Sequence, residues 1–341
     1  MPDARRLRIA QIAPVAQPVR RGAGDSIEQL VGALCDELVR RGHDVTLYAT
    51  GDSQTTARLR AERPIGYDED EHLWDWQFAE SVNAAAAFAH AGEHDVIHAH
   101  DLHFALPFAR LTSVPFVETQ HVDSSPEVRE TQRRTPTVHL TAASEHHRRE
   151  LGPGLDVTVI PHGIDVAAFP FSPEAGEYLL FLGRLLPDKG PLDAIRIARA
   201  AGLPIVLAGP EVEGEDHGIE PHLDGERVRW VGPVDHATRD RLLAGAAALL
   251  FPITYPEPFG LVMIEAMACG TPVLGTARGA VPEVVEHGVS GFVADDWEGL
   301  AGHVPAALAL DRHAIRARAE ARFGLQRMVD DYEALYRRLV A

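Results

Sequence analysis

Short apolar runs alternate with longer stretches of helical periodicity along the whole chain. The runs expected to form strands are 7–13, 45–49, 95–99, 114–118, 138–141, 178–182, 205–208, 228–231, 247–251 and 272–275. The helices expected between them include 27–41, 76–91, 192–201, 239–245 and 261–269. Strands that alternate with helices form parallel sheets with helices on both faces. In such sheets, ligands bind at the carboxyl ends of the strands.

The alternation stops once, between residues 163 and 177, where the chain is rich in Pro, Gly and acids and has no period. We therefore expect an α/β protein of two facing Rossmann-like domains, 1–163 on the acceptor side and 177–324 on the donor side, with 164–176 as the linker. Two such domains form a ligand cleft between them. The segment 325–341 predicts an amphipathic helix that could cross back to the first domain.

Composition narrows the range of partners. The chain has 341 residues with 32 basic and 50 acidic side chains, a formal net charge of −18. Such a charge repels nucleic acid and anionic lipid, so neither is expected as a partner. Cys35 and Cys269 lie in apolar helical patterns and are expected as buried thiols of a reducing compartment. With no signal peptide and no run that could span a bilayer, we expect a cytoplasmic protein without stable membrane insertion. The sequence does not indicate the oligomeric state.

The first candidate site is the loop after the strand 178–182. Gly183 and Arg184 open this loop, and Lys189 closes it just before the next helix. Two cations at the carboxyl end of a strand can clamp a diphosphate, Arg as a bidentate fork and Lys as a point charge. The alternative interpretation is a solvated loop with two surface cations.

The second candidate site is the pair Glu257 and Glu265, with an E-x(7)-E spacing. Glu257 lies in a Pro-rich loop, and Glu265 lies within the helix that follows. The free N–H groups of the first helical turn, between the two acids, can bind anions. Carboxylates accept hydrogen bonds from sugar hydroxyls, so the segment suits a ligand with a sugar, a ribose and a diphosphate. Taken alone, the spacing also fits an ordinary helix start.

These motifs and several others resemble the family 4 retaining glycosyltransferases, which have the GT-B fold. The matching segments are Gly42-His43-Asp44-Val45, Asp95 to Asp101, Thr119-Gln120-His121, Ile160 to Asp165, Gly183-Arg184 with Lys189-Gly190, Leu207-Ala208-Gly209, and Glu257 to Leu261 through Pro282-Glu283.

The resemblance implies a role for each motif residue. Arg184 and Lys189 would hold the donor diphosphate, Glu265 the donor ribose, and His121 would reach the donor sugar from the first domain. The transferred sugar and its phosphate would be held by Glu257 and the backbone of Phe259, Gly260 and Leu261. The implied reaction moves a hexose from a UDP- or GDP-sugar to a hydroxyl of a small molecule or glycan. It needs no metal and no cofactor besides this co-substrate.

Two positions depart from the family pattern. The Gly-Gly pair that usually opens the first helix is replaced by Asp25-Ser26, behind Gly22-Ala23-Gly24, and an acid there is unfavourable beside a diphosphate. Gly24, Ser26 and His100 are therefore assigned to an acceptor or phosphate loop, and Asp25 or Ser26 suits a helix N-cap. The second departure is Gly279-Ala280, where Gly-Gly is common.

Two other functions stay open at this stage. His98, His100 and His103 follow one strand, and imidazoles at a strand end bind zinc in some barrel hydrolases. That metal-dependent hydrolase would need further ligands, such as His121 and Asp165, on later strands of one barrel. The unusual Asp25-Ser26 loop would also suit a non-catalytic nucleotide-sugar sensor.

Overall fold

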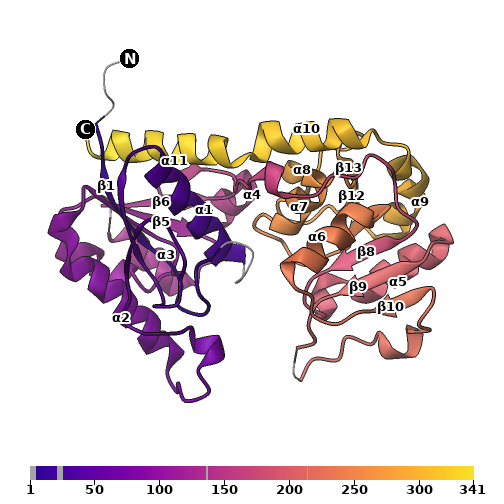
Figure 1. Cartoon of the computed structure of the whole chain (residues 1–341), viewed down its shortest axis with the longest axis horizontal. Helices are drawn as coiled ribbons and strands as arrows, with labels where there is room; N and C mark the ends of the chain where they lie inside the picture. The colour runs from indigo at the N-terminus through magenta and orange to yellow at the C-terminus, as the bar shows by residue number, and fades with distance from the viewer. Residues whose placement is uncertain (1–4, 21–25, 136, 213) are drawn as a thin grey trace. The chain divides into compact units, whose positions relative to one another are not determined.

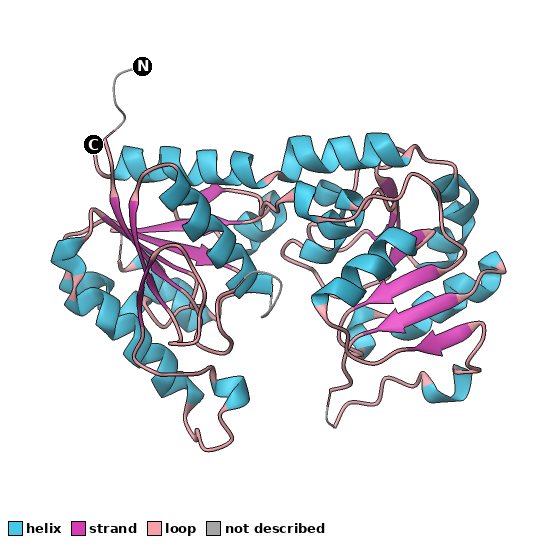
Figure 2. Cartoon of the chain, in the orientation of Figure 1, coloured by secondary structure: helices cyan, strands magenta, loops and turns pink. Residues whose placement is uncertain are grey.

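The computed structural model describes residues 5–20, 26–135, 137–212 and 214–341, and the chain divides into two compact units (Figure 1). Unit 1 comprises residues 1–163 together with 325–341, and unit 2 comprises residues 164–324. Each unit is a parallel β-sheet flanked by helices (Figure 2), which confirms the α/β architecture of two Rossmann-like domains.

The sheet of unit 1 has the order β3-β2-β1-β4-β5-β6-β7, and all neighbouring strands are parallel. Its strands are β1 Arg8–Ile12, β2 Asp44–Tyr48, β3 Arg58–Arg60, β4 Val96–Ala99, β5 Phe116–Gln120, β6 Val138–Ala142 and β7 Val157–Val159. The order reverses between β1 and β4, so the loops after these two strands diverge around one crevice at the carboxyl edge. The edge strands β3 and β7 were not predicted, because each is short and β3 is mostly charged.

Helices cover both faces of this sheet. They are α1 Ser26–Arg40, α2 Trp76–Ala89, α3 Pro126–Arg133, α4 Glu145–Glu150 and α11 Leu325–Leu339, with 3-10 helices η1 Tyr67–Glu69, η2 Ala91–Glu93 and η3 Leu106–Leu111. One core lies between the sheet and the pair α1 and α11, and a second core lies between the opposite face and α2 with η3. Buried apolar residues at helical spacing hold each helix to its face.

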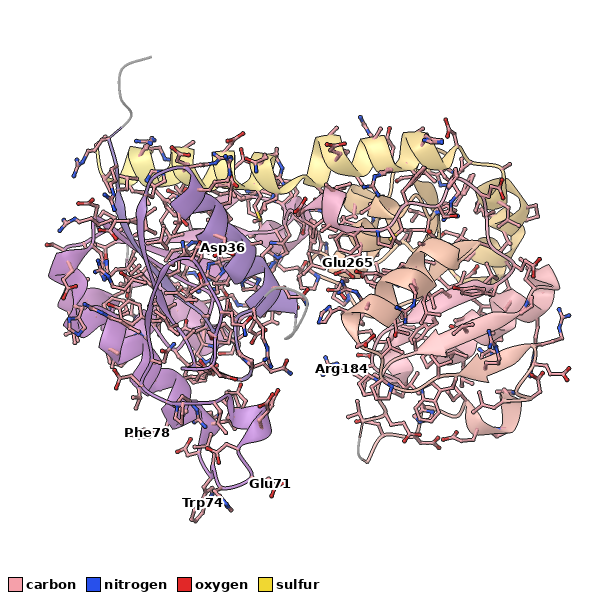
Figure 3. All side chains as sticks on the ribbon, viewed as in Figure 1. Asp36, Glu71, Trp74, Phe78, Arg184 and Glu265 are labelled. Atoms are coloured by element: carbon pink, nitrogen blue, oxygen red, sulfur yellow. The ribbon has the colours of Figure 1, made fainter. Side chains whose placement is uncertain are left out.

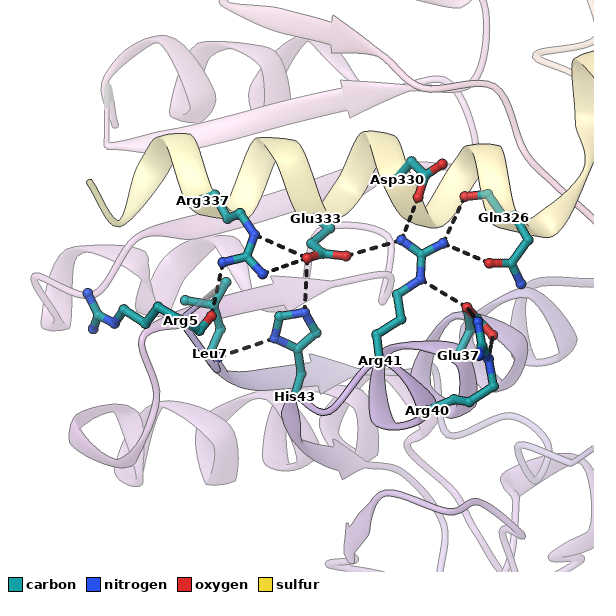
Figure 4. A network of polar contacts seen from close by, with 10 residues as sticks. All are labelled: Arg5, Leu7, Glu37, Arg40, Arg41, His43, Gln326, Asp330, Glu333 and Arg337. Carbon is teal, nitrogen blue, oxygen red and sulfur yellow. Dashed lines mark hydrogen bonds and ion pairs between the residues drawn. The ribbon is translucent and has the colours of Figure 1, made fainter. Parts of the chain in front are cut away.

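The C-terminal helix α11 is part of unit 1, although it follows the whole of unit 2 in the chain. Its apolar stripe, which includes Met328, Tyr332 and Tyr336, is buried. Polar contacts fasten its other flank (Figure 4): Arg41 lies 2.5 Å from Asp330 and 3.1 Å from Glu333. The helix is therefore held both by burial and by ion pairs.

The sheet of unit 2 has the order β10-β9-β8-β11-β12-β13, again all parallel. Its strands are β8 Leu179–Leu182, β9 Ile205–Ala208, β10 Val228–Trp230, β11 Ala248–Phe251, β12 Val273–Thr276 and β13 Gly291–Ala294. Its helices are α5 Pro191–Ala201, α6 His236–Gly245, α7 Leu261–Ala268, α8 Val281–Val284, α9 Trp297–Leu308 and α10 Arg312–Phe323, with η4 Val166–Ala168, η5 Pro187–Lys189 and η6 Glu220–His222. The edge strand β13 was not predicted.

The segment expected as a linker, 164–176, lies in unit 2. Arg316 on α10 donates hydrogen bonds to the carbonyl oxygens of Val166 and Phe169, at 2.8 and 3.1 Å. These bonds hold the segment against the helices of unit 2.

Cys35 and Cys269 are buried free thiols. Within the described ranges, no helix has the length and apolar character needed to cross a bilayer.

Candidate functional site

The carboxyl edge of β8 and β11 carries the predicted cation loop and the predicted acid loop. The two strands are neighbours, with Leu250 paired with Phe181. The strand order of unit 2 reverses here, because β9 lies on one side of β8 and β11 on the other. Ligands of doubly wound sheets bind at such a reversal. The loop after β8 contains Arg184 and Lys189, and the loop after β11 contains Glu257.

Lys189, Tyr255 and Glu257 form one cluster at this point. The Nζ of Lys189 lies 3.2 Å from Oε2 of Glu257, and their side chains are only 23% and 16% exposed. The hydroxyl of Tyr255 contacts both groups, and Nζ also lies 4.6 Å from the centre of the Tyr255 ring. Burial, followed by the negative charge of Glu257, raises the pKa of Tyr255, so its hydroxyl stays protonated and can donate to Glu257. Tyr255 was missed because a lone aromatic in a loop carries no periodic signal.

The backbones of the surrounding loops approach too closely for side chains. Gly190 has a φ of +77°, and a Cβ there would lie 2.2 Å from the carbonyl oxygen of Pro252. Gly279 has a φ of +57°, and a Cβ there would lie 2.2 Å from the carbonyl oxygen of Glu257. The N–H of Ala280 donates to that same oxygen at 2.8 Å. The loop of Gly279 and Ala280 thus packs directly on the backbone of Glu257, and Gly279 is the glycine that this close approach requires.

Arg184 lies beside the cluster of Lys189, Tyr255 and Glu257, and its charge can act on a bound anion. Its side chain is exposed and stands out from the ribbon (Figure 3). The guanidinium makes no hydrogen bond or ion pair with any residue that the structure describes. Its positive charge nevertheless acts to lower the pKa of Tyr255, against the effect of burial. Gly183, which precedes it, donates its N–H to the carbonyl oxygen of Ala208 at 3.0 Å and so continues the sheet.

The segment Phe259, Gly260 and Leu261 forms the start of α7. Gly260 is the N-cap, with a φ of 81°, and Leu261 is the first helical residue. Phe259 is 4% exposed and anchors the turn in the core. The first-turn N–H groups that α7 cannot satisfy internally lie directly after the loop of Glu257, as the sequence predicted.

Glu265 lies on α7 with a partner of its own. Arg239 on α6 places Nη1 3.1 Å from Oε1 of Glu265, and their side chains are 15% and 12% exposed. Burial raises the pKa of Glu265, while the charge of Arg239 acts in the opposite direction. Among the described residues, no hydrogen bond or ion pair joins Glu265 to Lys189 or Glu257. Arg239 was missed because it lies one helix earlier in the chain.

In unit 1, the predicted residues His100 and His121 meet at the carboxyl edge of β4 and β5. Nδ1 of His100 lies 3.1 Å from Nε2 of His121, and Nε2 of His100 lies 3.1 Å from Oε1 of Gln11. The ring of His162 stacks on that of His121 with centroids 5.2 Å apart. Burial lowers the pKa of His121 to about 3 and that of His100 well below its usual value, so both rings are neutral. Gln11 was not predicted as part of the site.

His98 does not join a metal site. Its Nδ1 lies 2.6 Å from the hydroxyl of Tyr336, and its Nε2 lies 2.6 Å from Oγ1 of Thr119. Both ring nitrogens are therefore used within the protein. The hydrolase alternative also required further ligands, such as His121 and Asp165, on later strands of a single barrel, and the two separate open sheets contradict such a barrel.

A group with metal-ligand composition lies elsewhere in the described part of the chain. Glu211, His217 and Glu220, between β9 and β10, have ligand atoms within 4.8 Å of one another.

The predicted loop before α1 is only partly described. Gly24 and Asp25 lie outside the described residues, and Ser26 is the first residue of α1. The structure therefore brings together Lys189 and Glu257 with Arg184 beside them, and, separately, His100 and His121.

Comparisons with known proteins agree with this fold. The family described as Glycosyl transferases group 1 matches residues 167–322, and the family described as Glycosyltransferase Family 4 matches residues 27–168. The fold and these matches define a GT-B protein. The chain belongs to the family 4 glycosyltransferases, as the motifs predicted.

Individual relatives cover most of the chain. A glycogen synthase of Mycobacterium tuberculosis is 35% identical over 275 residues, 70% of this chain and 65% of that protein. The chain thus spans less than two thirds of this relative. A D-inositol 3-phosphate glycosyltransferase of Frankia alni is 31% identical over 297 residues, 72% of this chain and 71% of that protein. The crystal structure of AviGT4, a glycosyltransferase involved in avilamycin A biosynthesis, is 27% identical with a TM-score of 0.77 and covers 98% of each chain.

Proposed function

We propose that this protein is a retaining glycosyltransferase of the hexosyltransferase type. It transfers a sugar from a nucleoside diphosphate sugar, with UDP or GDP as the nucleotide, to a hydroxyl group of a small molecule or glycan. The observation that carries this proposal is the cluster at the carboxyl edge of β8 and β11. There, Lys189 pairs with Glu257 at 3.2 Å, and Arg184, which pairs with no residue that the structure describes, lies close enough for its charge to act on Tyr255.

Charge explains why a diphosphate suits this edge. The chain carries a formal net charge of −18, so an anion needs a local source of positive charge. Arg184 offers a guanidinium that no described residue neutralises, and Arg binds phosphate with two parallel hydrogen bonds. Lys189 adds a point charge, and the N-terminus of α7 adds free N–H groups. In this arrangement Glu265 binds the ribose of the donor.

The chemical step requires stabilisation of the departing diphosphate. The bond from the anomeric carbon to the phosphate oxygen breaks, and a bond from the same face of that carbon to the acceptor oxygen forms, so configuration is retained. The acceptor's proton passes to an oxygen of the leaving phosphate. Arg184 and Lys189 offset the growing negative charge, each by roughly 3 to 4 kcal/mol. These fixed cations take the place of a metal ion.

Glu257 and His121 are assigned to the donor sugar. The carboxylate of Glu257 accepts hydrogen bonds from sugar hydroxyls, and its orientation is fixed by Lys189 and Tyr255. His121 lies at the carboxyl edge of β5 in unit 1 and is neutral, so it acts through hydrogen bonds. A glycogen synthase and a D-inositol 3-phosphate glycosyltransferase act on different acceptors, as their names indicate, and a hydroxyl-bearing acceptor is consistent with both relatives.

A screen of activated sugars tests this proposal. Thermal shift with UDP-, GDP-, ADP- and TDP-sugars identifies the donor, because a ligand that binds only the native state raises the melting temperature. Release of free nucleotide from the stabilising donor then reports slow hydrolysis or transfer. Binding without any turnover would indicate the nucleotide-sugar sensor instead. If no nucleotide sugar raises the melting temperature, the proposal is wrong.

A further inference from the structure

A continuous line of buried hydrogen bonds in unit 1 leads from the C-terminal helix to His121. The hydroxyl of Tyr336 on α11 lies 3.0 Å from Nε2 of Gln11 on β1. Oε1 of Gln11 lies 3.1 Å from Nε2 of His100, and Nδ1 of His100 lies 3.1 Å from Nε2 of His121. Tyr336, Gln11 and His100 are all 0% exposed. Water therefore does not compete for these bonds.

Gln11 gives this line a direction, because its amide has one donating end and one accepting end. The nitrogen of Gln11 donates to the hydroxyl of Tyr336, so that hydroxyl donates onward to Nδ1 of His98, 2.6 Å away. The oxygen of Gln11 accepts, so the hydrogen of the neutral His100 ring lies on Nε2. Nδ1 of His100 is then an acceptor, and Nε2 of His121 must donate to it.

From this geometry we propose that Gln11 is a positioning residue that holds His121 in its Nε2-protonated tautomer and leaves Nδ1 as a hydrogen-bond acceptor. Nδ1 makes no hydrogen bond with the residues that the structure describes. If His121 contacts the donor sugar, as the proposed function has it, Nδ1 accepts a hydrogen bond from a sugar hydroxyl. A half-turn of the Gln11 amide would reverse every donor in the line. His121 would then present an N–H and would suit a different sugar atom.

Nitrogen-15 NMR of the histidine rings measures this tautomer directly in the protein without substrate. We expect the His121 spectrum to show a protonated Nε2 and an unprotonated Nδ1, with the signals assigned by their loss in His121→Asn. In Gln11→Met, which keeps the length of the side chain but removes both polar atoms, we expect a mixture of the two tautomers. Gln132→Met removes another buried amide of unit 1, outside this line, and should leave the His121 signals unchanged.

Two further variants cover the case in which Gln11→Met does not fold. Gln11→Glu keeps an accepting oxygen towards His100 and should preserve the Nε2 tautomer. Tyr336→Phe removes the group that orients the amide and should produce the mixture. The inference would be overturned if His121 of the native protein were protonated on Nδ1. It would also be overturned if the His121 tautomer were the same in Gln11→Met and Tyr336→Phe as in the native protein.

A kinetic measurement tests the consequence for the sugar separately. Gln11→Met should raise the donor KM as the fraction of His121 in the Nε2-protonated tautomer falls, from about two-fold for an even mixture up to about ten-fold if that hydrogen bond is lost completely, while affinity for the free nucleotide stays unchanged. A shifted tautomer with an unchanged KM would overturn the contact between His121 and the sugar. Absence of all transfer activity would overturn the proposed function but not the tautomer, which NMR reads without turnover.

Discussion

The Nζ of Lys189 lies 3.2 Å from Oε2 of Glu257, so a charge pair joins the loops that follow the two central strands of unit 2. Both side chains are mostly buried, and burial makes each charge depend on the other. A diphosphate bound beside Arg184 would share Lys189 with Glu257. The pair therefore connects the predicted phosphate clamp to the predicted sugar contact.

Arg184→Ala should lower kcat/KM for the donor by about 10²- to 10³-fold, because one fixed donor to the departing phosphate is lost. The melting temperature should stay unchanged, since the side chain is exposed and holds no other described residue. Transfer or donor hydrolysis followed by nucleotide release is the measurement. Arg196→Ala, another exposed arginine of unit 2, serves as the control. A near-normal rate for Arg184→Ala would remove it from the clamp.

Lys189→Met should weaken binding of the free nucleoside diphosphate by more than the double change Lys189→Met with Glu257→Gln. The single variant leaves the mostly buried carboxylate of Glu257 without its cation beside the proposed phosphate site, and the double variant removes that charge. Isothermal titration of UDP and GDP against the variants measures the difference. A double variant that binds more weakly than the single one would show that Glu257 does not repel an unshielded diphosphate.

Glu265→Gln should reduce nucleotide affinity, because in the proposed arrangement an amide would replace the carboxylate that binds the ribose hydroxyls. The change also leaves the guanidinium of Arg239, now 3.1 Å from Glu265, without its anion. Arg239→Gln is therefore the control for loss of the ion pair alone. Calorimetry with UDP and GDP measures the nucleotide affinity of both variants and of the native protein. Unchanged affinity in Glu265→Gln would contradict the ribose assignment.

Glu118→Gln should stabilise unit 1 increasingly as the pH rises from about 4.5 to 8. Burial, together with the negative charge of Asp101, raises the pKa of Glu118 on β5 to about 8. The folded protein then holds a proton that the unfolded chain has lost, so stability falls with rising pH across this window. Glutamine does not titrate.

Chemical denaturation at pH 5 and pH 8 measures the effect of Glu118→Gln. The difference in unfolding free energy between the two proteins should grow by at most about 1.4 kcal/mol per pH unit. Glu69→Gln, an exposed acid of the same unit, should show no such trend. Equal pH slopes for Glu118→Gln and the native protein would mean that Glu118 is already ionised in the folded state.

Transfer activity should survive incubation with EDTA, because fixed cations stabilise the leaving group in the proposed mechanism. Glycosyl transfer before and after chelation is the measurement. Loss of activity that zinc or manganese restores would contradict metal independence. His217→Ala would then show whether Glu211, His217 and Glu220 hold the ion.

Local patterns were sufficient for much of the architecture. Apolar runs and helical periods predicted the central strands and α1, α2, α5, α6 and α7 with small displacements of their ends, because buried elements show their periodicity along the chain. The edge strands β3, β7 and β13 were missed, since an edge strand is short and needs no continuous apolar run. The segment 164–176 has no period, yet Arg316 holds its carbonyls within unit 2.

The residues of the candidate donor loops could be chosen from the sequence, because each lies beside a strand end or a helix start and those are local features. The residues that contact them could not be chosen from the sequence. Tyr255, Arg239 and Gln11 carry no motif, and each matters only through a contact with a residue from another element. Sequence alone predicted the α/β architecture and the family, and it proposed the cations and acids of the candidate site. Tertiary structure decided which charges are paired and which histidine nitrogens bond to other described residues, because hydrogen bonds and burial depend on distances between segments that are far apart in the chain.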